Sequence, residues 1–179
     1  MMSEPEPTPL GKYGLFAEIG FCKYFHFGGA EATRELIQAC GIFEKACLLD
    51  VGCASGKTAC TLARLYGCRV VGVDLLPKMV EEARQRARDE GVEGLVDFRV
   101  GDAQALPLEA GQFDVMIGEF IAGLLESKEK AVQEYVRVVK PGGTIGLNEA
   151  TWIKPPPPGF PLYLAMTVGL RGEVLTVDG

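Results

Sequence analysis

One short glycine-rich segment carries residues that could bind a nucleotide-like ligand. Residues 50–56 read Asp-Val-Gly-Cys-Ala-Ser-Gly and are followed by Lys57 and Thr58. Glycines at this spacing allow sharp backbone turns, and the free N–H groups at the start of a following helix then face a polar ligand. The segment therefore predicts a binding loop, and the spacing of its residues decides which ligand the loop suits.

Two familiar loops do not fit this spacing. A phosphate-binding loop has the pattern G-x-x-x-x-G-K-[ST], but only three residues separate Gly52 from Gly56. A dinucleotide loop has the pattern G-x-G-x-x-G, which would place its last glycine at position 57, where the chain has Lys57. The loop is thus too short to wrap a phosphate and lacks a glycine of the dinucleotide pattern.

A third pattern, D-x-G-x-G-x-G, fits from Asp50 to Gly56 with Ala54 in place of the middle glycine. On this motif the chain resembles the class I S-adenosylmethionine-dependent methyltransferases. It looks most like the small-molecule branch that includes the ubiquinone- and menaquinone-biosynthesis enzymes (the methyltransferase type 11 domain). The resemblance runs from about residue 26 to residue 152 and implies S-adenosylmethionine as the cofactor.

Further motifs follow in the order that this family has. Asp74 ends an apolar run and, by the resemblance, accepts from the ribose hydroxyls, while Leu75 packs on the adenine. Asp102 and the Ala103 N–H lie in "GDAQALP" and match the adenine-binding positions, and "FDVMIGEF" matches the fourth-strand motif. The implied cofactor-binding set is Asp50, Gly52, Cys53, Ala54, Gly56, Asp74, Leu75, Met79, Asp102, Ala103, Gly118, Glu119 and Phe120.

The segment before the loop adds three candidates. "HFGGAEAT" resembles a segment that closes over the cofactor in this branch, so Gly28 and Gly29 join the binding set. Residues 13–29 are rich in aromatic side chains and predict a lid, with a permanently packed helix as the alternative. Should the acceptor need a general base, Glu119 and His26 are the candidates, although no motif assigns either of them that role.

The elements that must position these residues alternate along the chain. Continuous apolar runs predict buried strands, and apolar residues at helical spacing predict helices between them. Strands are expected at 46–51, 69–74, 95–100, 113–120 and 144–150, and helices at 28–41, 57–67, 77–91 and 130–140. Alternation of this kind predicts a doubly wound α/β fold, here Rossmann-like and mostly parallel. The resemblance implies the strand order 3-2-1-4-5.

The sequence predicts one domain with three parts. Residues 1–44 form an N-terminal arm and helical lid, 45–152 the cofactor-binding core, and 153–179 a proline-rich connector with a partial helix. The C-terminal hairpin that completes the sheet in the family is expected to be missing. The fifth strand then has an open edge that a homodimer or another partner would cover. The alternative is a natural short form whose tail covers that edge.

Composition narrows the partners. The net charge is −6 and no basic stripe is evident, which disfavours nucleic acid. No apolar run reaches the roughly 18 residues of a membrane span, and the six cysteines include no C-x-x-C pair, so neither a membrane span nor a metal site is expected. A reducing cytoplasmic setting is predicted.

The predicted function is methyl transfer to an unidentified small-molecule acceptor. A cofactor-binding module without its own catalysis is the main alternative, and a nicotinamide oxidoreductase is a weaker one.

Overall fold

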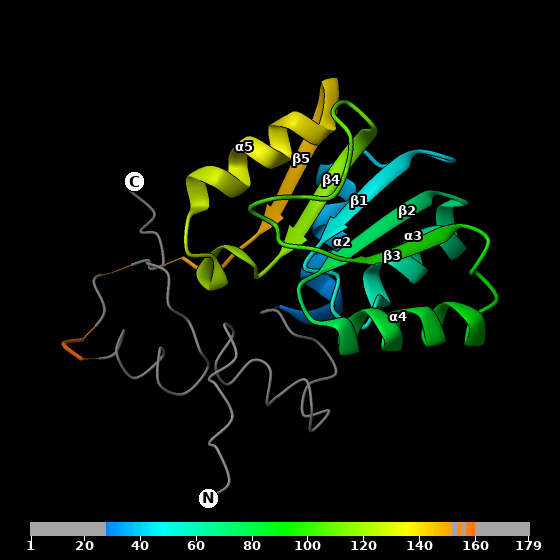
Figure 1. The fold of residues 1–179 in the computed structure, drawn as a ribbon, viewed down its shortest axis with the longest axis horizontal. Coiled ribbons are helices and arrows are strands. Elements are labelled where there is room, and N and C mark those ends of the chain that lie inside the picture. Colours follow the sequence, from blue (N-terminus) through cyan, green and yellow to red (C-terminus); the bar gives the residue numbers. More distant parts are fainter. Residues whose placement is uncertain (1–27, 152–153, 155–156, 160–179) are drawn as a thin grey trace, which may run out of the picture.

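A five-stranded parallel sheet forms the centre of the protein. The computed structural model describes residues 28–151, 154 and 157–159. Within them the strand order is β3-β2-β1-β4-β5, which Figure 1 shows from right to left. The strands are β1 (Cys47–Val51), β2 (Arg69–Asp74), β3 (Val96–Val100), β4 (Phe113–Glu119) and β5 (Val139–Asn148). The predicted doubly wound α/β fold and its strand order are confirmed.

Strand β1 is buried because both of its neighbours are strands and both sheet faces are covered. Leu48 pairs with Val70 of β2 on one side and with Val115 of β4 on the other. Leu48 and Leu49 have no exposed surface. This is why the sequence reads as an uninterrupted apolar run here, with Asp50 as its one polar member.

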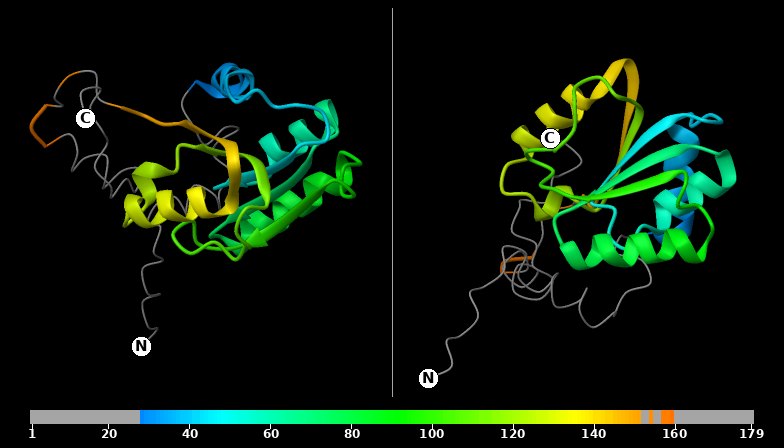
Figure 2. Two further views of the ribbon diagram at one scale, coloured as in Figure 1. Left: turned by 90° about the horizontal axis from the view of Figure 1, so that it is seen from above. Right: turned by 45° about the vertical axis from the view of Figure 1, so that its right-hand side comes forward.

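Helices cover the two faces of the sheet and produce two apolar cores. The helices are α2 (Gly29–Ala39), α3 (Lys57–Tyr66), α4 (Pro77–Asp89), η1 (Ala122–Leu124) and α5 (Lys128–Val138). One core joins buried side chains of α2, α3 and α4 to the sheet, and the other joins α5 and the loop before β4 to it. Figure 2 shows α2 and α5 on opposite sides of the sheet.

The helix boundaries follow local signals in the sequence. Helix α4 begins at Pro77, whose fixed backbone angle suits the first helical turn. Helix α3 ends at Gly67, which adopts a left-handed conformation with φ 61°. Helix α5 begins after Ser127, whose hydroxyl accepts the Lys130 N–H at 3.3 Å.

The last helix–strand junction differs from the prediction. The sequence placed a stop at Pro141-Gly142-Gly143 and a strand from Thr144, but α5 ends at Val138 and β5 begins at once at Val139. The proline and glycines lie inside β5, where its register against β4 shifts. A side chain at Gly143 would lie 2.7 Å from the Asp114 carbonyl oxygen, so only glycine fits this shift.

Several expectations concern residues outside the described ones. His26, most of the lid segment 13–29 and the C-terminal segment from residue 160 belong to this group. The proposed domain boundaries therefore stay predictions. Across the described ranges, no helix is long and apolar enough to cross a membrane.

Candidate functional site

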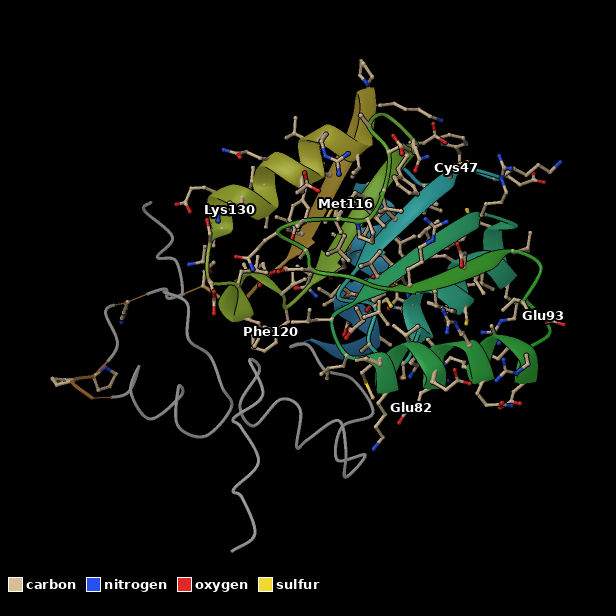
Figure 3. The ribbon with its side chains drawn as sticks, viewed as in Figure 1. Cys47, Glu82, Glu93, Met116, Phe120 and Lys130 are labelled. Carbon is tan, nitrogen blue, oxygen red and sulfur yellow. The ribbon has the colours of Figure 1, made fainter. Side chains whose placement is uncertain are left out.

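A pocket opens at the carboxyl ends of the strands. Loops that follow β1, β2, β3 and β4 form its walls. Figure 3 shows Phe120 at this end of the sheet and Cys47 at the opposite end. Seven predicted binding residues line the pocket, namely Gly52, Asp74, Leu75, Asp102, Ala103, Glu119 and Phe120. Residues from four segments far apart in the sequence are thus brought together at one site.

The glycine-rich loop needs its glycines for two physical reasons. Gly52 and Gly56 have φ angles of 73° and 74°, in the left-handed region that side chains disfavour. Space is also lacking, because a Cβ on Gly56 would lie 2.7 Å from Cζ of Phe98. A Cβ on Gly52 would lie 3.0 Å from Cδ1 of Ile121 in the pocket wall. The loop therefore passes close to both the core and the pocket.

Asp74 joins the glycine-rich loop to the end of β2. It is only 4% exposed, and its two carboxylate oxygens accept the N–H groups of Ala54 and Leu76, each at 2.9 Å. Burial raises the pKa of Asp74, and the two N–H bonds lower it. The carboxylate acts as a structural acceptor at the pocket wall and retains lone pairs that can accept from a ligand.

Asp50 lies deeper than the sequence motif implied. It is buried and is not among the pocket-lining residues. Its Oδ2 atom has no hydrogen-bond partner in the part of the chain that the structure describes. Burial, followed by the nearby carboxylates of Glu119 and Asp74, raises the pKa of Asp50 to about 8. A hydrogen bond from the Ala59 backbone acts in the opposite direction.

Glu119, at the end of β4, is a junction between elements. Its Oε1 accepts the Thr58 hydroxyl of α3 at 3.0 Å, and its Oε2 accepts the Thr33 hydroxyl of α2 at 2.8 Å. The Asn148 amide of β5 also donates to Oε2 at 3.3 Å. The candidate general base is thus an acceptor that holds two helices and the neighbouring strand at the pocket.

Asp102, which follows β3, forms a turn in the pocket wall. Its Oδ1 accepts the Gln104 N–H at 2.8 Å and the Gln104 side-chain amide at 3.2 Å. The Gln104 side-chain oxygen in turn accepts the Ser127 N–H at 2.7 Å. Gln104 lines the pocket but was missing from the predicted set, although it stood in the same "GDAQALP" motif.

An apolar wall after β4 was also missed. Ile121, Leu124 and Leu125 line the pocket, and Glu149 holds their segment in place. One oxygen of Glu149 accepts the N–H groups of Ile121 and Ala122, at 2.8 and 2.9 Å. The run "IAGLLE" was a usable signal, because its apolar residues had no assigned role in a strand or a helix.

The other predicted binding residues do not line the pocket. Cys53, Met79 and Gly118 are buried, and burial raises the pKa of the Cys53 thiol. Gly28 and Gly29 lie at the start of α2. Ala54 and Gly56 belong to the loop behind the pocket. The roles of these residues in binding stay predictions.

No group of side chains suited to a metal ion is found among the described residues.

Comparisons with known proteins agree with this arrangement. A family model described as "Methyltransferase domain" matches residues 49–147, which include β2 to β4 and most of β1 and β5. Norajmaline N-methyltransferase of Rauvolfia serpentina is 38% identical over 98 residues, 55% of this chain and 34% of that protein. Methyltransferase GfsG of Streptomyces halstedii is 33% identical over 137 residues, 76% of this chain and 49% of that protein.

A solved structure shares the fold. The S-adenosylmethionine-dependent methyltransferase from Geobacter sulfurreducens, in complex with S-adenosyl-L-homocysteine, superposes with a TM-score of 0.76 at 23% identity. The match covers 99% of this chain and 68% of that one. This chain spans half or less of the length of the two curated relatives described above.

Proposed function

The chain belongs to the methyltransferase domain family, and from this premise we propose that it transfers a methyl group from S-adenosylmethionine to a small molecule. The observation that carries the proposal is the placement of the pocket. It lies where β1 adjoins β4, the point at which successive connections of the sheet turn to opposite sides. Open α/β sheets bind their ligands at such points.

The polar groups of the pocket suit this cofactor. Asp74, Asp102 and Glu119 line it as carboxylates, and no lysine or arginine is among its described lining residues. The ribose hydroxyls, the adenine amino group and the methionine ammonium are all hydrogen-bond donors, so acceptors are what they require. A triphosphate is usually bound with cationic partners instead. The pocket thus favours S-adenosylmethionine over ATP, and the loop, with Lys57 in place of the last glycine of the dinucleotide pattern, disfavours NAD.

The chain's contribution to catalysis is placement. When bound, S-adenosylmethionine supplies a methyl group that its sulfonium already activates. Asp74 accepts from the ribose, Asp102 and the Ala103 N–H bind the adenine, and Leu75 packs against its ring. The apolar residues Ile121 and Leu124 exclude water. Orientation of two reactants in this way is worth on the order of 7–11 kcal/mol of barrier.

A binding module without independent catalysis is the second candidate. Glu119 is the one general-base candidate among the described residues. Both of its oxygens already accept hydrogen bonds from other elements, which suits a structural role better than proton transfer and so supports the binding module. Calorimetry with S-adenosylhomocysteine, NAD and ATP tests the cofactor. Radiolabelled methyl transfer to a panel of apolar amines, phenols and carboxylic acids then tests catalysis.

The outcomes separate the candidates. Methyl transfer to any acceptor supports the enzyme, and tight binding of S-adenosylhomocysteine without transfer supports the module. The absence of binding at millimolar S-adenosylhomocysteine would overturn both. Amines head the panel because a relative is named as an N-methyltransferase.

We also propose that a second copy of the chain covers the edge of β5, beyond which no further strand lies among the described residues. Gly146 of β5 faces Leu36 and Cys40 of α2, so Ile145 and Leu147 point to the other face, where α5 lies. One flank of α5 binds the loop before β4 through Arg137.

The opposite flank of α5 exposes Val132 and Val136, which are 50% and 63% exposed. With Ile145 and Leu147 they form an apolar surface beside the β5 edge. A two-fold antiparallel pairing of β5 would bury this surface in both copies.

The five cysteines in the described ranges are free thiols, in keeping with the proposed cytoplasmic setting.

A further inference from the structure

The glycine-rich loop contains a residue in an unfavourable conformation. Ala54 has a φ of 44°, in the left-handed region, between the left-handed glycines Gly52 and Gly56. An L-residue with a Cβ disfavours this region, and such conformations persist only where the surroundings enforce them. Contacts from outside the loop must therefore hold residues 52–56 in this conformation, next to Gly52 in the pocket wall.

Two side chains from different elements bind the backbone of this segment. Asp74, at the end of β2, accepts the Ala54 N–H at 2.9 Å. Arg86 of α4 donates from Nε to the Ser55 carbonyl oxygen at 2.8 Å, and its Nη2 lies 3.5 Å from the Ser55 hydroxyl. Consecutive residues of the loop are thus tied to two elements that follow it in the sequence.

Arg86 is itself held in place. Its Nη1 lies 3.5 Å from Oε1 of Glu90, and the other oxygen of Glu90 lies 3.3 Å from the Arg64 guanidinium of α3. Because a guanidinium is planar and presents several donors at fixed angles, it can bind the Ser55 carbonyl and Glu90 together. Arg86 is not among the pocket-lining residues. Any effect it has on a ligand must therefore pass through the loop.

We propose that Arg86 is a positioning residue for the cofactor, because its guanidinium holds the Ser55 carbonyl and so keeps the loop and the start of α3 in their binding shape. This inference rests on the proposed function of the same pocket. Free N–H groups at the N-terminus of α3 suit a carboxylate, and the methionine part of the cofactor carries one, so this part of the bound cofactor would lie against the loop. Loss of Arg86 therefore weakens contacts to that part and leaves contacts to the adenosine part unchanged.

Two ligands separate this role from general support of the fold. S-adenosylhomocysteine carries the amino acid part, and 5′-methylthioadenosine lacks it. Calorimetry on the full chain should show that Arg86→Met raises the Kd of S-adenosylhomocysteine at least tenfold. The Kd of 5′-methylthioadenosine should stay within twofold of the wild-type value. Arg86→Lys should give an intermediate result, because a single ammonium cannot reproduce the planar contacts.

A matched control lies on the same helix. Arg84 binds β3 and not the loop, because it donates to the Phe98 carbonyl oxygen at 2.7 Å. Arg84→Met should leave the Kd of both ligands unchanged. Thermal unfolding of each variant shows whether it is folded, and if Arg86→Met does not fold, Arg86→Lys carries the test.

A double variant tests the conformational argument. Glycine adopts the left-handed region without cost, so in an Ala54→Gly background the loop needs less restraint. The rise in the Kd of S-adenosylhomocysteine caused by Arg86→Met should then be at least threefold smaller than in the Ala54 background.

Three results would overturn the inference. One is unchanged binding of S-adenosylhomocysteine by Arg86→Met, and another is equal weakening of both ligands, which would assign Arg86 to the fold alone. The third is a wild-type protein that binds neither ligand, in which case the proposed function fails and the inference fails with it. Wild-type binding that is unaffected by Arg86→Met overturns only the inference.

Discussion

At the scale of single residues, buried carboxylates dominate the site. Asp50 and Asp74 are the two polar or charged residues that are buried within the described part of the chain. Burying a charged carboxylate without hydrogen-bond partners costs free energy. Both residues are nevertheless buried at the carboxyl ends of the strands, beside the pocket. The ionisation of both residues therefore links the stability of the fold to pH, and the acceptor atoms of Asp74, which line the pocket, link the fold to the ligand.

Asp50 should make the protein less stable as the pH rises. Its pKa is about 8 when folded, against an ordinary value of 3.8. Between these two values the folded state holds a proton that the unfolded state has lost. The free energy of unfolding therefore falls with rising pH, by up to about 1.4 kcal/mol per pH unit. We predict that Asp50→Asn flattens this decline, as measured by urea unfolding at several pH values.

The control for Asp50→Asn is an exposed carboxylate. Asp97 of β3 pairs with Arg99 at the surface, and Asp97→Asn should leave the pH dependence close to that of the wild type. A wild-type slope retained in Asp50→Asn would contradict the argument.

Asp74 should matter more to ligand binding than to stability. Asp74→Ala removes a charged acceptor, which is worth about 1.5–3 kcal/mol of binding to S-adenosylhomocysteine. The same change frees two N–H groups but also removes the cost of burying the carboxylate, so the loss in unfolding free energy should be smaller. Calorimetry and urea unfolding measure the two effects. Unchanged affinity would mean that Asp74 has only a structural role at the end of β2, as an acceptor for backbone N–H groups.

At the scale of elements, close packing decides where α2 lies. A Cβ on Gly146 of β5 would collide with the Cys40 thiol and would lie 3.0 Å from Cδ1 of Leu36. The helix thus approaches the strand as closely as a residue without a side chain allows. Thr33, one turn before Ile37, then reaches Glu119 at the pocket.

We predict that Gly146→Ala displaces α2 and lowers the free energy of unfolding by about 1–3 kcal/mol, the usual cost of overpacking. Gly94→Ala is the matched control, because a Cβ there has no neighbour within 4 Å. Adding Cys40→Ala should recover part of the loss by making room. Thermal or urea unfolding of the three variants tests this, and equal stability of Gly146→Ala and wild type would refute it.

What the sequence could predict at this scale was set by local signals. Apolar runs and helix-ending glycines such as Gly67 lie within or directly after the elements they define, so strands β1 to β4 and helices α2 to α4 were predicted correctly. The start of β5 was not, because the role of Gly143 depends on Asp114 of a neighbouring strand. The contacts of Glu149 and Arg86 were missed for the same reason: their partners are distant in the sequence.

At the scale of the whole molecule, the two edges of the sheet differ. The β3 edge carries the Asp97–Arg99 ion pair, and the Arg84 guanidinium donates a hydrogen bond to the Phe98 carbonyl oxygen. Charges of this kind discourage the pairing of edge strands. The β5 edge exposes the apolar side chains of Ile145 and Leu147, whereas Val100 is the exposed apolar residue of β3.

We predict that the wild-type chain is a dimer and that Ile145→Lys makes it a monomer, because the lysine would place two charges in the buried pairing. Sedimentation equilibrium over a range of concentrations measures this. Val100→Lys, which places the same charge at the opposite edge, should leave the dimer intact. A wild-type monomer at every concentration would contradict the proposal, and so would equal loss of the dimer in both variants.

The central place of β1 also has a consequence for synthesis on the ribosome. Leu48 is made shortly before its β2 partner Val70, but its β4 partner Val115 comes much later. Until residues 113–119 leave the exit tunnel, one side of β1 has no strand to pair with, and the apolar surface of the emerging chain stays open to other proteins. Long-range pairing of this kind is slow and prone to aggregation. The nascent chain should therefore depend on chaperones most strongly in the interval between the emergence of β3 and the emergence of β4 from the exit tunnel.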